Sequence, residues 1–380
     1  MGGLIYLDNA ATTFPKPRSV TEAVRECMIN KGGNPGRGSH KLSRNAAELV
    51  YDTREAAAKL FDAEAENVVF TMNATQALNC AIKGLARPGC HILIDNYSHN
   101  AVYRPVIALA KAGVCTFDIY DASGNTETTI ADISKKLRNN TSIVVATHQS
   151  NICSKVLPIK EIGEYCKKRG IHFVVDGSQS AGHIKISVKD MHISALCLPG
   201  HKGLFGPMGV GLLVSGDGVK YRTIIEGGAG VASLDAYMPD DLPERLEAGT
   251  LPLPAVSGLL AGIRFVSEAG EENIHTYEKM LTSIIEREAP ALGRMKIYGE
   301  CGGSVISFNV DGYTPSQVGE YLSRAGICAR TGYHCAPIAH KTVGSFDVGS
   351  VRVGVSYLNR PSDMYALLSA LRKLNSQIVK

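Results

Sequence analysis

Residues 142–176 read SIVVATHQSNICSKVLPIKEIGEYCKKRGIHFVVD. An apolar, β-branched run at residues 142–147 is followed by a helical pattern near residues 160–168 and by a second apolar run at residues 171–175. Two near-continuous apolar strands joined by a helix are typical of a parallel sheet that is covered on both faces. We therefore expect an α/β fold with a mainly parallel sheet.

The same alternation of apolar runs and helical patterns continues on both sides of this stretch. Further helices are expected near residues 43–60, 75–85, 100–111 and 129–138. Further strands are expected at residues 67–71, 91–95, 114–118, 195–198 and 209–214. The large sheet should therefore contain about seven strands, with helices between most of them.

A turn-rich segment at residues 226–250 interrupts the alternation, and a long helical stretch at residues 255–269 follows it. Beyond that point the pattern is mixed, with helices expected at 271–286, at 315–325 and from 361, and strands at 305–310 and 351–356. We expect two domains on this basis. The large domain would contain residues 16–250, and a small α+β domain would combine residues 1–15 with residues 251–380.

The composition is that of an ordinary globular chain. Of 380 residues, 44% are hydrophobic and 20% are charged, and the net charge is +4. No block of five or more Lys and Arg residues occurs, so a nucleic-acid partner is not expected. No apolar run reaches the roughly 18 residues of a membrane span, and the N-terminus lacks the features of a secretion signal. We therefore expect a cytoplasmic protein without a membrane partner.

The ten cysteines and eleven histidines show no pattern of a metal site. No C-x-x-C pair occurs, and the histidines lack the spacing of zinc ligands, so no metal is expected. Most cysteines, such as Cys115 and Cys197, lie in apolar runs. In a reducing compartment such cysteines are buried thiols rather than disulfides.

Polar residues gather where four of the predicted strands end. They occupy residues 71–75, 95–99, 147–151 and 176–179. The carboxyl ends of parallel strands lie at one edge of a sheet, which is where such sheets bind ligands. The sequence therefore predicts one shared site at this edge.

Lys202 lies in the turn Gly200-His201-Lys202-Gly203, directly after an apolar run. Burial lowers the pKa of a lysine and favours imine formation by its amine. Asp176 ends the preceding predicted strand, and by itself would be a turn residue or a helix cap. Together, the amine and the carboxylate indicate a site for pyridoxal 5′-phosphate (PLP). The lysine would form a Schiff base there, and the aspartate would keep the pyridine nitrogen protonated.

Three further residues have both a structural and a cofactor-binding interpretation. Thr75 precedes a helix, so it is either a cap or part of an anion site made with the free N–H groups of the helix. His99 is either an ordinary loop histidine or a flat ring that stacks on the pyridine. Gln179, three residues after Asp176, can donate to a phenolate oxygen.

Cys335 and Arg352 are candidates for the chemistry of the substrate. A buried structural thiol is the usual state of cysteine, but Cys335 lies in a loop whose Arg330 and His334 are expected to favour the thiolate. Arg352 lies in an apolar strand, and a buried guanidinium needs an anion. That anion is either a structural carboxylate or a substrate carboxylate held by two hydrogen bonds.

Taken together, these motifs resemble those of the aminotransferase class V group of PLP enzymes, and within it those of the cysteine desulfurases. The resemblance covers nearly the whole chain. The matching motifs are YLDNAATT at residues 6–13, RGSH at 37–40 with Ser43, SN at 150–151, GHK at 200–202 with FGP at 205–207, and EAGT at 247–250. The short loop RTGYHC at residues 330–335 is similar to that of group II desulfurases and selenocysteine lyases.

The resemblance implies a fold-type-I PLP-dependent transferase that forms a homodimer with its sites at the interface. For the cofactor ring it implies a Schiff base at Lys202, stacking by His99, a contact of Asp176 with the pyridine nitrogen and a contact of Gln179 with the phenolate oxygen. The substrate carboxylate would be bound by Asn151 and Arg352.

For the phosphate, the resemblance implies binding by Thr75, His201, the backbone N–H groups near Ala74 and the partner's Thr250. Pro199 departs from the motif, because many relatives have Ser or Thr at this position. Proline has neither a hydroxyl nor an N–H to offer the phosphate.

The activity implied is removal of sulfur from L-cysteine through a PLP aldimine, with Lys202, His99 and Cys335 as the catalytic residues. The products would be L-alanine and a persulfide on Cys335, which then passes its sulfur to an acceptor protein. A selenocysteine lyase on the same scaffold and a class V aminotransferase are alternatives. A non-catalytic scaffold that binds a sulfur-transfer partner is a further alternative.

Overall fold

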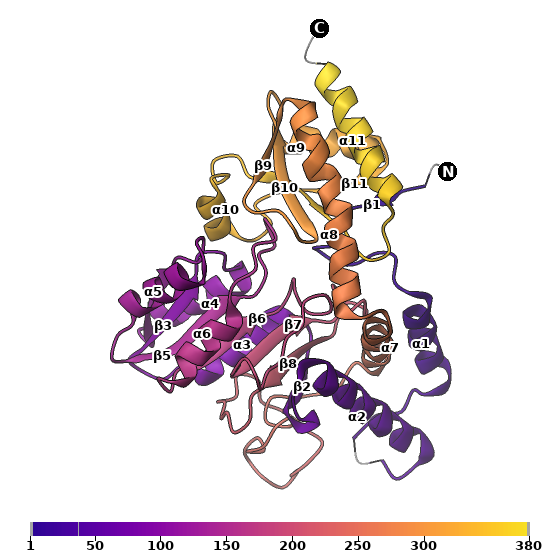
Figure 1. Ribbon diagram of the computed structural model, residues 1–380. Coiled ribbons are helices and arrows are strands. Elements are labelled where there is room, and N and C mark those ends of the chain that lie inside the picture. Colours follow the sequence, from indigo (N-terminus) through magenta and orange to yellow (C-terminus); the bar gives the residue numbers. More distant parts are fainter. Residues whose placement is uncertain (1–2, 37, 378–380) are drawn as a thin grey trace.

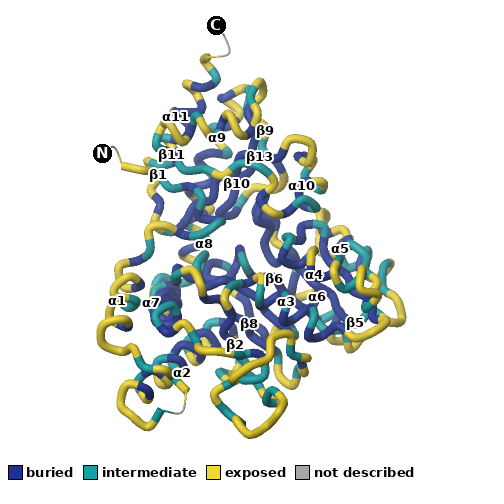
Figure 2. The backbone as a smooth tube through the Cα atoms, turned by 180° about the vertical axis from the view of Figure 1, so that it is seen from behind, coloured by how far each residue is buried: buried dark blue, intermediate teal, exposed yellow. Residues whose placement is uncertain are grey.

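The computed structural model describes residues 3–36 and 38–377. The chain folds into two lobes, each with its own sheet (Figure 1). The larger lobe lies below the smaller one in this view, and both ends of the chain lie at the smaller lobe. Figure 2 shows that the strands of both sheets are mostly buried. No helix in the described part of the chain has the length and apolar character that crossing a membrane requires.

Among the described residues, seven strands form the large sheet, in the order β2-β8-β7-β6-β5-β3-β4. Only β8 runs antiparallel to its neighbours, so the prediction of a mainly parallel sheet is confirmed. The strands are β2 (Val68–Thr71), β3 (Cys90–Asp95), β4 (Cys115–Tyr120), β5 (Thr141–Thr147), β6 (His172–Asp176), β7 (Ala195–Pro199) and β8 (Gly211–Ser215).

Helices cover both faces of this sheet, which explains why its central strands are apolar throughout. Side chains of β5 alternate between the faces: Ile143 and Val145 belong to one core cluster, Val144 and Ala146 to the other. The first face is covered by α3 (Ala74–Leu85) and α4 (Asn100–Lys111). The second is covered by α2 (Lys41–Phe61), α5 (Thr126–Lys136), α6 (Ile159–Lys167) and α7 (Leu253–Ala269). A 3₁₀ turn, η1 (Ala65–Asn67), leads into β2.

Helix α1 (Arg18–Asn30) was not predicted from the sequence. It packs on α7, and it buries only Val20 and Cys27 fully, so its apolar pattern is weak. Helix α7 in turn packs on α2 and shares its core with Phe205 of the large lobe. The division into residues 16–250 and residues 1–15 with 251–380 stays a prediction.

The small lobe contains a four-stranded antiparallel sheet in the order β12-β13-β10-β9, and a parallel pair, β1 with β11. The strands are β1 (Ile5–Tyr6), β9 (Met295–Tyr298), β10 (Val305–Val310), β11 (Ile327–Cys328), β12 (Arg330–Gly332) and β13 (Ser350–Gly354). The helical segments are α8 (Glu271–Glu288), η2 (Ala289–Leu292), α9 (Pro315–Arg324), α10 (Pro337–Val343) and α11 (Pro361–Ser376). Strands β1, β9, β11 and β12 and helix α10 are short and were not predicted.

The ten cysteines are all free thiols. Seven of them are buried, including Cys115 and Cys197, as the apolar runs predicted. Cys301 and Cys335 are exposed, and Cys328 is half-buried.

Candidate active site

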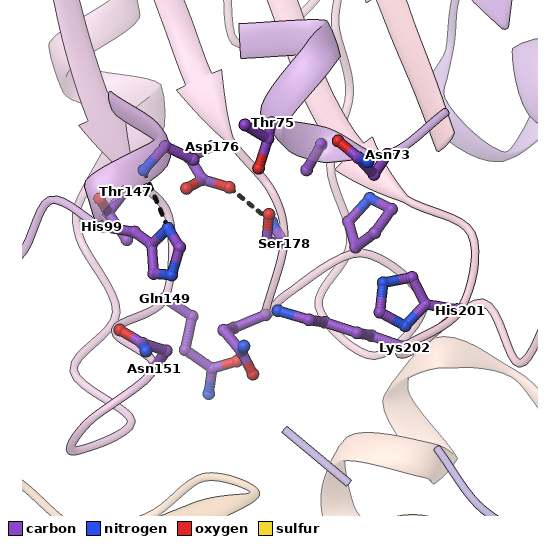
Figure 3. A pocket seen from close by; sticks show the side chains of 14 residues that line it. Asn73, Thr75, His99, Thr147, Gln149, Asn151, Asp176, Ser178, His201 and Lys202 are labelled. Atoms are coloured by element: carbon purple, nitrogen blue, oxygen red, sulfur yellow. Dashed lines mark hydrogen bonds between the residues drawn. The ribbon is translucent and has the colours of Figure 1, made fainter. Parts of the chain in front are cut away.

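The carboxyl ends of β5, β6 and β7 meet the N-termini of α3 and α4 around one pocket (Figure 3). The empty space in it, including the part open to solvent, is about 510 Å³. Eight of the predicted site residues line it: Ala74, Thr75, His99, Asn151, Asp176, Gln179, His201 and Lys202. Thr250, Cys335 and Arg352 do not line this pocket, and their places are described below.

Lys202 reaches into the pocket from the turn that follows β7 (Figure 3). The turn is closed by backbone hydrogen bonds from Gly200 to Val210 and from Gly206 to Gly200, at 2.9 and 2.8 Å. Burial lowers the pKa of Lys202 to about 8, although the Asp176 carboxylate opposes this shift. A larger fraction of the amine is therefore neutral and nucleophilic near pH 7 than for an ordinary lysine.

Asp176 ends β6 and is 3% exposed, with its Oδ1 accepting a hydrogen bond of 3.0 Å from the N–H of Ser178. Gln179 lies on the same turn and is also buried. Its Nε2 donates to the carbonyl of Ala10 at 3.0 Å, which ties the N-terminal segment to the floor of the site. The carboxylate and the amide therefore have fixed positions.

The N-terminus of α3 forms the anion-binding end of the pocket. Asn73 caps the helix by accepting a hydrogen bond of 3.0 Å from the N–H of Gln76. The preceding N–H groups, those of Ala74 and Thr75, belong to the first turn, which has no intrahelical acceptor for them. Gly211 permits this packing, because a Cβ there would lie 2.8 Å from the Cα of Asn73.

Two histidines line the pocket as neutral rings, because burial lowers the pKa of both His99 and His201 to about 4. His99 caps α4, and its Nδ1 accepts from the N–H of Ala101 at 3.0 Å, so its Nε2 carries the hydrogen. The Nδ1 of His201 is buried and has no hydrogen-bond partner within the described residues. His201 can therefore meet a ligand through this nitrogen.

Arg352 is 2% exposed and lies on β13 of the small lobe. Its guanidinium donates to the Asp8 carboxylate at 3.1 Å and to the carbonyl of Asn151 at 3.2 Å. Of the two anions considered from the sequence, the structure therefore supplies a structural carboxylate, held by one hydrogen bond. The Nε of Arg352 and the Oδ1 of Asn151 are buried without a partner in the described part of the chain.

Cys335 is exposed and lies in the loop between β12 and α10, where His334 and Cys335 both have positive φ, +48° and +58°. The carbonyl of Cys335 accepts a hydrogen bond of 2.8 Å from the N–H of Asn100. The carbonyl of His334 accepts one of 2.9 Å from the side chain of Asn151. The loop of the small lobe is thereby attached to the large lobe beside the pocket.

The expectation that His334 favours a thiolate at Cys335 is wrong. The His334 ring is 5% exposed, and burial lowers its pKa to about 2, so the ring is neutral. Its Nε2 lies 3.1 Å from the carbonyl of Ser350 and holds the loop against β13. Arg330 is exposed and lies opposite Arg352 in the sheet, so it is the remaining cation of this loop.

Thr250 lies apart from the other predicted residues of its own chain. It is exposed and borders a different hollow, with Arg54 and Glu247. Those two side chains form a buried ion pair with two hydrogen bonds, of 2.8 and 2.7 Å. The pair anchors the end of the turn-rich segment to the start of β2.

Besides Pro199, five residues that line the pocket were not among the predicted site residues: Asn73, Ala101, Thr147, Gln149 and Ser178. Thr147 ends β5, Gln149 and Asn151 follow it at every second position, and all three line the pocket. Their spacing of two and four positions from Asn151 is the sequence signal that could have predicted Gln149 and Thr147 as site residues. Pro199, the last residue of β7, also lines the pocket.

A family model described as aminotransferase class-V matches residues 5–367 of the chain. The chain therefore belongs to the aminotransferase class-V family. Relatives that match nearly the whole chain include proteins named as probable cysteine desulfurases. A probable cysteine desulfurase of Methanothermobacter thermautotrophicus is 30% identical over 97% of this chain and 94% of the relative. One of Pyrococcus abyssi is 30% identical over 98% of this chain and 94% of the relative.

Solved structures lead to the same group. The structure of a cysteine desulfurase from Thermococcus onnurineus has a TM-score of 0.90 and 30% sequence identity. It covers 98% of this chain and 95% of its own. The expected class of fold, a fold-type-I architecture with a large and a small lobe, is thereby confirmed.

Proposed function

We propose that this protein is a PLP-dependent cysteine desulfurase that converts L-cysteine to L-alanine and leaves the sulfur as a persulfide on Cys335. One observation carries the proposal. The Lys202 amine and the Asp176 carboxylate share a pocket, and the exposed thiol of Cys335 belongs to a loop hydrogen-bonded at its edge. An amine, a carboxylate and an accessible thiol are the groups that this reaction needs.

The pocket residues fit PLP. His201 has a buried ring nitrogen without a partner in the described chain, and the N-terminus of α3 offers N–H groups, as a phosphate requires. Asp176 is buried where a protonated pyridine nitrogen would need a carboxylate. His99 offers a neutral ring that can stack. Lys202 would hold the cofactor covalently.

When bound, PLP supplies an electron sink for the negative charge that develops at Cα of an amino acid. The Nζ of Lys202 acts as the general base that takes the Cα proton, because its lowered pKa keeps part of it neutral. Arg352 would orient the substrate carboxylate through its unpartnered Nε, and Asn151 through the second N–H of its Nδ2, since the first is donated to the carbonyl of His334. Orientation decides which bond at Cα is broken, so this contact governs the type of reaction.

Cys335 is the nucleophile of the sulfur transfer. Its thiolate Sγ attacks the substrate sulfur, a new S–S bond forms, the Cβ–S bond breaks, and the electron pair of that bond stays with carbon. Protonation of the carbon skeleton completes L-alanine. In total, L-cysteine and the Cys335 thiol give L-alanine and a Cys335 persulfide, and no external oxidant is needed.

The same residues support further parts of the proposal. Thr250 borders another hollow of its own chain, so a phosphate contact from this hydroxyl would come from the partner's Thr250 in a homodimer. The exposure of Cys335 suits transfer of its sulfur to the thiol of an acceptor protein. A reactive free thiol suits a reducing compartment such as the cytoplasm.

The test is incubation of the purified, PLP-loaded protein with L-cysteine or with L-selenocysteine, with and without a reductant. We expect alanine and sulfide in equal amounts from cysteine when the reductant is present, and a persulfide on Cys335 when it is absent. Alanine from selenocysteine alone would make the protein a selenocysteine lyase. A keto acid with pyridoxamine phosphate would make it an aminotransferase.

A further inference from the structure

The segment that follows β5 projects alternate side chains into the pocket. Thr147 ends β5, Gln149 forms an isolated antiparallel bridge with Val156, and Asn151 lies in the turn that follows; all three line the pocket. Gln149 is completely buried and lies between Asn151 and Lys202 in Figure 3. Neither the proposed cofactor contacts nor the sulfur transfer uses it.

The amide of Gln149 is held at one end only. Its Oε1 lies 3.0 Å from the Nε2 of His183, so this nitrogen carries the hydrogen and donates it to the amide oxygen. The Nε2 of Gln149 has no hydrogen-bond partner in the described residues. It lies at the seam between the lobes, where a Cβ on Gly303 would come within 2.6 Å of it. A buried N–H₂ group without a partner is costly unless a ligand accepts from it.

The other ring nitrogen of His183 faces α8. Its Nδ1 lies 3.4 Å from the Oε2 of Glu278, a residue of α8 that is 3% exposed. Burial lowers the pKa of His183 to about 4 and raises that of Glu278 to about 8, so both are neutral near pH 7. The Oε2 of Glu278 has no hydrogen-bond partner in the described residues, so the proton of the imidazole is assigned to Nε2 by its contact with the Oε1 of Gln149. His183 thereby keeps the oxygen of Gln149 occupied and its nitrogen available.

The other donors near the expected substrate carboxylate are partly occupied. The Nδ2 of Asn151 donates to the carbonyl of His334, and the guanidinium of Arg352 donates to Asp8 and to the carbonyl of Asn151. A carboxylate that enters a buried pocket needs several donors to replace its water. Gln149 lies two residues from Asn151 on the same face, so its amide can supply one.

We propose that the Nε2 of Gln149 donates a hydrogen bond to the carboxylate of the amino-acid substrate, with His183 as the positioning residue that keeps this nitrogen turned to the substrate. The inference rests on the proposed function. It adds a neutral donor to the carboxylate contacts and connects it to α8 of the small lobe.

The test compares L-cysteine with L-cysteine methyl ester, which lacks the carboxylate, in the PLP-loaded protein and in Gln149→Met. Methionine keeps the length of the side chain and removes the donor. We expect kcat/KM for cysteine to fall roughly 10- to 100-fold, mainly through KM, and kcat/KM for the ester to change less than about threefold. An equal loss of activity toward the acid and the ester would overturn the inference. An unchanged preference for the free acid would overturn it too.

Two further variants test the positioning role. His183→Gln keeps an N–H donor for the Oε1 of Gln149 and should retain most of the preference for the free acid, whereas His183→Leu should lose it as Gln149→Met does. Equal loss in both His183 variants would overturn the positioning role. A changed cofactor absorbance in substrate-free Gln149→Met, with an unchanged KM, would place the amide on the cofactor instead. Failure of the wild-type protein to form alanine would refute the proposed function and is a separate outcome.

Discussion

The carbonyl oxygen of Cys335 accepts a hydrogen bond of 2.8 Å from the backbone N–H of Asn100, the residue that follows His99. This bond joins the cysteine loop of the small lobe to the first turn of α4, whose cap lines the pocket. The thiol itself remains exposed. The loop is therefore anchored through its backbone, while its side chain is free to reach a ligand or an acceptor.

The first prediction concerns the thiol. Cys335→Ala should keep PLP and lose persulfide formation from L-cysteine, because no sulfur nucleophile remains at the pocket edge. Cys301→Ala is the matched control, since Cys301 is the other exposed cysteine, and it should react like the wild type. Mass spectrometry of the protein after one incubation with cysteine checks both. A persulfide that survives in Cys335→Ala, or disappears in Cys301→Ala, would contradict the assignment.

The second prediction concerns the choice between two half-buried lysines. Burial lowers the pKa of both Lys16 and Lys202 to about 8. The Nζ of Lys16 is bonded to the carbonyl of His201 at 2.8 Å and does not line the pocket, whereas Lys202 does. Borohydride reduction of the PLP-loaded protein, followed by peptide mapping, should therefore place the pyridoxyl group on Lys202. A label on Lys16 would be incompatible with the proposed site.

The third prediction is a pH dependence. A pKa of about 8 leaves roughly a tenth of the Lys202 amine neutral at pH 7, and this fraction rises as the pH increases through 8. Since only the neutral amine attacks an aldehyde, covalent capture of PLP by cofactor-free protein should accelerate with pH and level off above pH 8. Asp176→Asn removes a charge that raises this pKa, so its midpoint should lie lower. Stopped-flow absorbance measures both midpoints, and a higher midpoint in the variant would contradict the role of Asp176.

The fourth prediction concerns stability. Glu247 is buried with Arg54 and also accepts a hydrogen bond of 2.6 Å from the N–H of Phe70. Arg54→Met would leave a buried carboxylate without its cation and should lower the free energy of unfolding by about 3–5 kcal/mol. The loss should shrink at low pH, because burial raises the pKa of Glu247 and protonation removes the unpaired charge.

The double variant Arg54→Met with Glu247→Met provides the control for this ion pair. It removes both charges, so it should be more stable than Arg54→Met alone. Denaturant unfolding of the three proteins gives the comparison. Equal stabilities of the single and double variants would show that the buried charge is not the cause.

Much of the large lobe could be predicted because its signal is local. The run at residues 142–147 is apolar at successive positions, which fits a strand buried on both faces, and β5 occupies residues 141–147. The short elements could not be predicted in this way. The two residues of β11 carry no period, and β11 exists because it pairs with Ile5 and Tyr6, more than 300 positions away.

The site likewise has features that could be predicted from the sequence and features that could not. Lys202, Asp176 and His99 follow strands, and strands of one parallel sheet end at one edge, so their meeting could be expected before any coordinates. The partner of Arg352 could not be, since Asp8 is separated from it by 344 positions. The charge state of His334 could not be predicted for a related reason: Gly332 and Pro337 indicate a loop, but packing on β13 buries the ring and keeps it neutral.

Residue types and their order along the chain were sufficient to predict a PLP-type site at the carboxyl edge of a mainly parallel sheet, because strand burial and helix spacing are properties of short segments. The attachment of the cysteine loop to α4, the exposure of its thiol, the ion pair of Arg352 with Asp8 and the free nitrogen of Gln149 were decided by tertiary packing. Each of these depends on which distant backbone or side chain fills the space around a group. Burial, hydrogen bonding and charge state are set by those neighbours, and a linear pattern does not contain them.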